Sequence, residues 1–181
     1  MPQPLLTLEP LIDAVCAGVV SRGWELSGLQ KTTSTAFEGR WEGDSTRSAY
    51  LFFHHHDHED VSVDVYLDET SRGLQGNLAL VLDLRALPEL PPVPDVLAAL
   101  SEMAARHMLE GYRTPVTLRL RLGDTPRPVE RATLEARIKL ALPAAGVEAG
   151  AGAIEAVAGA TVDAFRSLLA DPTSHVLRAE S

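Results

Sequence analysis

The strict alternation of apolar and polar residues over positions 61–68 is the feature that most constrains the fold of this chain. Its apolar positions are Val61, Val63, Val65 and Leu67, and its polar positions are Ser62, Asp64, Tyr66 and Asp68. Such a period of two is typical of a strand with one buried face and one face in water. The segment therefore predicts a half-buried strand of an antiparallel sheet.

Four further segments predict strands. Their approximate ranges are 33–42, 47–56, 77–86 and 116–122. Turn-forming residues separate the first three strands, at Gly43-Asp44 and over residues 57–60. Short turns of this kind join neighbouring antiparallel strands, so the first half of the chain predicts a meander.

Helical spacing of apolar residues predicts four helices. Their approximate ranges are 7–22, 95–110, 125–142 and 154–170. Thr125-Pro126 is a favourable helix start, because the hydroxyl can cap the first turn and proline fits the first helical position. Residues 144–153 contain three glycines and predict a flexible connector before the final helix.

These elements together predict an α+β fold. We expect a two-layer sandwich in which helices cover one face of an antiparallel sheet of about five strands, with an additional C-terminal helix. The α+β domain would span residues 1–143, and residues 144–181 would form a flexible linker and a helical appendage. The uncovered sheet face would be polar and would carry Glu38, Arg40, Ser62, Asp64, Arg119 and Arg121.

Charge and cysteine content restrict the environment of the protein. The chain of 181 residues has 16 Lys and Arg against 25 Asp and Glu, a net charge of −9. Such a chain repels phosphate backbones and anionic lipids unless its cations cluster. A single cysteine, Cys16, precludes an internal disulfide and fits a reducing compartment. The N-terminal residues do not resemble a secretory signal, so we expect a cytoplasmic protein that does not enter a membrane.

The tract His54–Asp60 is the clearest candidate for chemistry. Imidazoles and carboxylates are ligands for zinc, nickel or copper, and a strand would put His54, His56 and His58 on one side. The tract lies at a hairpin turn, however, where solvated polar residues collect. We therefore predict no metal site, no cofactor and no catalytic residues, with a metal-dependent enzyme using residues 54–60 as an alternative.

Charge is unevenly distributed along the chain. Residues 37–69 contain nine acids and two arginines, whereas residues 113–131 contain five arginines and two acids. A surface polarised in this way can steer a charged partner. A second alternative is a nucleic-acid accessory protein that uses a stripe of Arg113, Arg119, Arg121, Arg127 and Arg131 beside Tyr112. The net charge argues against this alternative.

Several of these segments together resemble the YbjN-like proteins. The similarity rests on the first helix with Gly23-Trp24 at its end, the acidic meander over 37–67, the helix over 95–110 and the strand over 114–122. It covers residues 5–142. It implies a fold like that of type III secretion chaperones, which are small, acidic, often dimeric proteins that bind other proteins without catalysis.

We therefore expect a non-catalytic protein-binding module of the bacterial cytosol, chaperone-like or an adaptor. Its partner would dock on the polar sheet face through Asp64, Arg119 and Arg121. The amphipathic final helix predicts a homodimer that buries Phe165, Leu168 and Leu169 between two copies.

Overall fold

The computed structural model confirms an α+β fold with an antiparallel sheet and a C-terminal helix. It describes residues 6–33, 45–89, 91–107, 116–121 and 133–178. The sheet has six strands in the order β1-β2-β3-β4-β6-β5. They are β1 (Glu25–Thr33), β2 (Ser45–His55), β3 (His58–Thr70), β4 (Gly73–Asp83), β5 (Val116–Arg121) and β6 (Thr133–Ala141).

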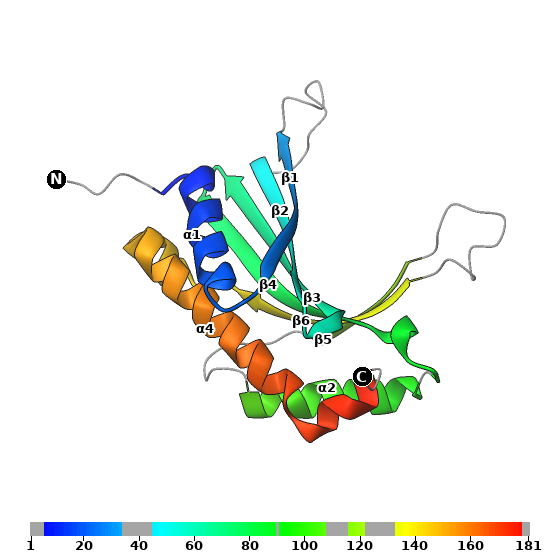
Figure 1. Ribbon diagram of the computed structural model, residues 1–181. Helices are drawn as coiled ribbons and strands as arrows, with labels where there is room; N and C mark the ends of the chain where they lie inside the picture. Colours follow the sequence, from blue (N-terminus) through cyan, green and yellow to red (C-terminus); the bar gives the residue numbers. More distant parts are fainter. Residues whose placement is uncertain (1–5, 34–44, 90, 108–115, 122–132, 179–181) are drawn as a thin grey trace.

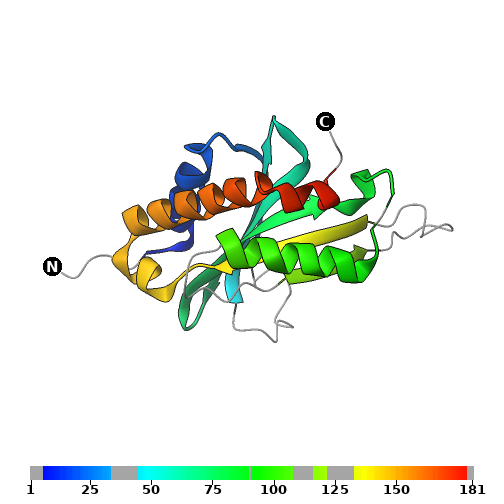
Figure 2. The same ribbon diagram turned by 90° about the horizontal axis from the view of Figure 1, so that it is seen from below.

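Helices lie on one face of this sheet and leave the other face uncovered (Figure 1). They are α1 (Leu8–Val20), α2 (Val93–His107), α3 (Ala144–Ala149) and α4 (Ala151–Leu169), with short 3-10 helices η2 (Leu84–Ala86) and η3 (Pro172–Leu177). Seen from below, α2 and α4 lie in front of the sheet (Figure 2). Among the described residues, no helix is both long and apolar enough to cross a membrane.

The alternation over residues 61–68 forms β3, as expected. Val61, Val63, Val65 and Leu67 are buried against the helices. Their neighbours in the core come from β2, β4 and β6, namely Leu51, Phe53, Leu78, Leu80, Leu82, Ala136, Ile138 and Leu140. The two-residue turn His56-Asp57 joins β2 to β3, so the predicted hairpin is confirmed.

The prediction of a helix over residues 125–142 is wrong for residues 133–141, which form strand β6. Residues 125–132 lie outside the described residues. Ala136, Ile138 and Leu140 point into the core, and they alternate with charged residues as in any half-buried strand. Alanine, leucine, lysine and glutamate favour helices. Pairing with β4 on one side and β5 on the other overrides that preference.

The first strand also differs from expectation. Of the range predicted as a strand, 33–42, all but Thr33 lies outside the described residues, and the observed edge strand is β1, directly after Trp24. β1 pairs only with β2 in the described sheet. A strand at a sheet edge has one neighbour and needs a weaker hydrophobic pattern, so its sequence signal is weak.

The C-terminal segment packs into the core. Residues 144–149, expected to be a flexible connector, form α3, and Ile154, Val162 and Phe165 of α4 belong to the same hydrophobic cluster as the strands. Gly18 of α1 lies against α4: a Cβ at this position would be 2.4 Å from the carbonyl oxygen of Glu155. The two helices therefore approach each other at backbone distance.

An ionic cluster connects α2 to η3. The carboxylate of Asp171 is largely buried and accepts hydrogen bonds from Arg106 at 3.0 Å and from the backbone N–H of Thr173 at 2.9 Å. His107 Nε2 lies 2.7 Å from the same carboxylate. The Thr173 amide, His107 and Arg106 hold the pKa of Asp171 well below its usual range. This cluster fixes η3 against α2.

Candidate functional site

The uncovered face of the sheet is concave and forms an open cavity of about 720 Å³. The sheet bends away from its helices, so the face is open toward the side of Figure 1 that carries no helix. All six strands contribute to its lining. The lining residues are Ser27, Gly28, Gln30, Tyr50, Phe52, His54, Ser62, Asp64, Val65, Tyr66, Asn77, Arg119, Glu135, Arg137 and Lys139.

Arg137 lies at the centre of the charged part of this face. Its guanidinium donates to Asp64 Oδ2 and to Glu135 Oε2, both at 3.1 Å. Ser62 Oγ donates a further hydrogen bond of 3.2 Å to Asp64 Oδ1. The Arg137 side chain is only 10% exposed, yet its Nε has no hydrogen-bond partner among the described residues. This nitrogen is itself buried, so it is not exposed to the cavity.

Two more cations line the same part of the face. Arg119 of β5 is directly opposite Glu135 of β6, and Lys139 lies four residues further along β6. Burial is the main cause of the lowered pKa of Lys139, and the positive charges of Arg137 and Arg119 lower it further. Lys139 has no ion-pair partner in the part of the chain that the structure describes. Three cations and two carboxylates therefore line this face, although the whole chain is acidic.

Aromatic side chains form the other part of the face. The rings of Tyr50 and Tyr66, on paired strands, are 4.9 Å apart and inclined by 44°. Tyr50 is 40% exposed, and Phe52 lines the cavity beside it. Gly28 leaves room for that ring, since a Cβ there would lie 3.2 Å from Phe52 Cδ2. Aromatic side chains are enriched at surfaces that bind other proteins.

The residues expected to bind a partner are only partly brought together. Asp64 and Arg119 both line the concave face, whereas Arg121 lies in β5 with a side chain outside the described part. Sequence reasoning missed Glu135, Arg137 and Lys139 because it placed them in a helix. The sequence did contain the signal of a strand, because these charged residues alternate with the apolar residues Ala136, Ile138 and Leu140.

Phe165, Leu168 and Leu169 require a correction. They were expected to pair across a homodimer, but their exposed fractions are 0%, 0% and 5% within one chain. They pack in the core cluster with residues of α1 and the sheet. The close contact of α4 with α1 turns the apolar stripe of α4 inward, so these side chains are not on the surface.

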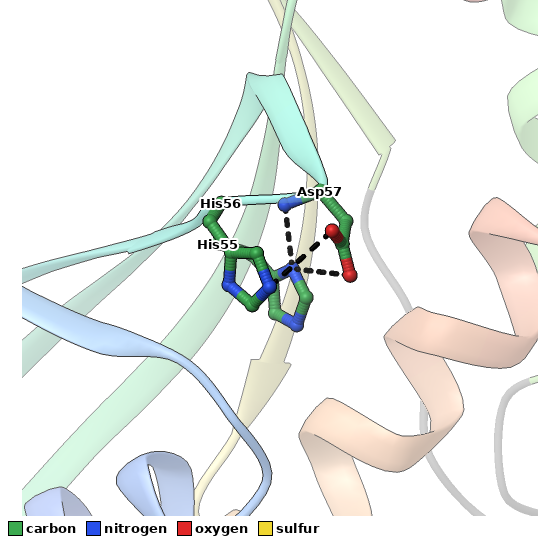
Figure 3. A group of neighbouring side chains, drawn as sticks. All are labelled: His55, His56 and Asp57. Carbon is green, nitrogen blue, oxygen red and sulfur yellow. Dashed lines mark hydrogen bonds and ion pairs between the residues drawn. The ribbon is translucent and has the colours of Figure 1, made fainter.

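The histidine-rich hairpin lies at one end of the sheet (Figure 3). One possible ligand atom from each of His55, His56 and Asp57 lies within 4.8 Å of the others. The expected grouping of His54, His56 and His58 on one side is wrong, because β2 ends at His55, His56 lies in the turn and His58 begins β3. His54 lines the concave face.

Other contacts already engage two histidines of this hairpin. His55 is mostly buried, packs edge-on against Trp24 with ring centres 5.2 Å apart, and accepts the Asp57 N–H at Nδ1. His58 Nδ1 lies 3.1 Å from Arg178 Nη2, and Arg178 also donates to both oxygens of Asp60. Burial, followed by the charge of Arg178, lowers the pKa of His58.

We expect removal of metal ions to leave the stability of the protein unchanged. Its hydrophobic core, which includes Leu51, Phe53 and Val63, supplies the folding free energy without ligation. Thermal unfolding before and after treatment with a chelator would measure this. A melting temperature lower by many degrees after chelation would show that the hairpin holds a structural metal ion.

The proposed arginine stripe cannot be assembled from the described residues. Tyr112, Arg113, Arg127 and Arg131 lie outside them, and Arg119 is on the concave face. Comparison with protein-family models, with curated proteins and with solved structures gave no match. The geometry of the site is therefore the basis for a functional proposal.

Proposed function

We propose that this protein is a non-catalytic binding module, chaperone-like or an adaptor, that receives a segment of another protein on its concave sheet face. The observation that carries the proposal is the combination of exposed aromatic rings and uncompensated cations on one uncovered face. The described helices do not cover this face (Figure 1), and its concave shape suits an extended or helical segment.

The charged groups of the face support binding more than chemistry. Asp64 and Glu135 are both occupied by ion pairs with Arg137. A carboxylate fixed in this way holds the arginine side chain in place. The resemblance to YbjN-like proteins, which bind other proteins, agrees with this proposal.

We also propose that the protein is cytoplasmic and that it forms a homodimer. The single cysteine fits a reducing compartment. A dimer would need a surface other than that of Phe165, and the edge strand β1 offers exposed Leu26 and Leu29, each 44% exposed. Sedimentation that finds a monomer at micromolar concentration would remove the dimer from this proposal.

Replacing Arg119 and Arg121 by glutamate is expected to slow association with the partner and to change its salt dependence. The double substitution changes the local charge by about −4 and reverses the potential that steers the encounter. The partner is first identified by affinity capture with the wild-type chain. Association rates of the purified pair at two ionic strengths then measure the effect.

The control is the double variant Lys31→Glu and Arg72→Glu, which has the same charge change at exposed positions outside the concave face. Circular dichroism confirms that both variants are folded. Equal association rates for the two folded variants would place the binding surface elsewhere, most directly on the acidic segment over 38–69.

A further inference from the structure

The concave face carries more positive charge than its own carboxylates neutralise. Three cations line it, Arg119, Arg137 and Lys139, against two carboxylates, Asp64 and Glu135. Both carboxylates already bind Arg137 at 3.1 Å. Burial is the main cause of the lowered pKa of Lys139, and the charges of Arg137 and Arg119, which lower it further, agree with this excess. An anionic group that entered here would be attracted at short range.

Arg137 adds a directional donor to this excess. Its Nη1 and Nη2 each donate one hydrogen bond, to Glu135 and to Asp64, and each nitrogen has a second N–H. Its Nε is itself buried and is not within reach of a ligand. A carboxylate is the acceptor that matches guanidinium and ammonium donors.

The neighbouring aromatic rings define a second property that a matching ligand needs. Tyr50, exposed by 40%, and Phe52 line the cavity on β2, on the same face as the cations of β5 and β6. Aromatic surface of this kind stabilises complexes by packing against apolar or aromatic side chains. A matching ligand therefore combines carboxylates with at least one aromatic or apolar side chain.

We propose that the concave face binds an acidic peptide segment, with its carboxylates on Arg119, Arg137 and Lys139 and an aromatic or apolar side chain against Tyr50 and Phe52. This inference rests on the proposed protein-binding function and specifies the chemistry of the partner. Because the whole chain is acidic, with a net charge of −9, recognition depends on this local positive surface at distances shorter than about 8 Å.

The test uses an eight-residue peptide of alternating glutamate and tyrosine and a matched peptide of alternating lysine and tyrosine. Titration of the isotopically labelled full chain, followed by nuclear magnetic resonance, should show shifts of β2, β5 and β6 amide signals with the acidic peptide. The lysine peptide should leave these signals unchanged. Raising the salt concentration should weaken the binding of the acidic peptide.

Lys139→Gln should weaken binding of the acidic peptide about fivefold, the effect of losing one partly exposed ion pair. The control is Lys31→Gln, an exposed cation on β1 that does not line the cavity, and it should bind like the wild type. Neither substitution removes a core side chain, so both variants should fold, which the spectra themselves show.

Two outcomes would overturn the inference. One is equal binding of the lysine and glutamate peptides, and the other is an acidic peptide that shifts none of the sheet signals. The proposed function is tested separately, by whether association with the captured partner depends on Arg119 and Arg121. A partner that needs this face but binds it through a basic segment would reject only the acidic chemistry.

Discussion

Replacing Phe165 by alanine is expected to lower the free energy of unfolding by about 3–5 kcal/mol, the usual cost of truncating a buried phenylalanine. The Phe165 ring is fully buried on α4 and packs in the same cluster as the sheet and α1. Its removal leaves a cavity that neighbouring backbone elements cannot easily fill. Chemical denaturation followed by circular dichroism would measure the loss.

Val176→Ala is the matched control in the same C-terminal part of the chain. Val176 lies on η3 and is 47% exposed, so its truncation should change the free energy of unfolding by less than about 0.5 kcal/mol. The comparison also tests the sequence-based division of the chain at residue 143. If residues 144–181 were an independent appendage, both substitutions would leave the unfolding of the remaining domain unchanged.

Gly18→Ala is expected to destabilise the protein by about 1–3 kcal/mol, as overpacking of a close contact does. The added Cβ would lie 2.4 Å from the Glu155 carbonyl oxygen and 2.9 Å from the Ala158 Cβ, so α1 and α4 would have to separate. Alanine favours a helix over glycine by about 1 kcal/mol, which opposes only part of this cost.

The same substitution at Gly152 is the control, because nothing lies within 4 Å of the Cβ that it would add. Gly152 is exposed in the first turn of α4. Alanine favours a helix over glycine, so the substitution should raise the free energy of unfolding by up to about 1 kcal/mol. Equal effects of the two alanine substitutions on the midpoint of chemical denaturation would contradict the close packing of α1 against α4.

Local pattern was sufficient for most of the elements. The alternation in β3, the turn before it and the apolar stripes of α1 and α4 each predict the observed structure from neighbouring residues alone. The uncovered polar face and three of its residues, Ser62, Asp64 and Arg119, followed from the same period. In these segments the side-chain preference and the tertiary environment favour the same conformation.

Residues 133–141 show where local pattern was insufficient. Their composition favours a helix, whereas their alternation fits a strand, and only pairing with β4 and β5 decides between the two. That pairing also brings Arg137 to Asp64, 73 positions away in the sequence, and completes the charged part of the concave face. Nothing near residue 137 indicates this contact.

The sequence by itself determined the fold class, the β2–β3 hairpin and the polarity of each sheet face, because these depend on periods and turn residues that are read within one segment. The tertiary structure decided the order of the strands, the burial of α4 and the grouping of Arg119, Arg137 and Lys139. Each of these depends on which distant segments pack together, and close packing of whole elements, such as α4 against α1 at Gly18, is a property of their combined shape.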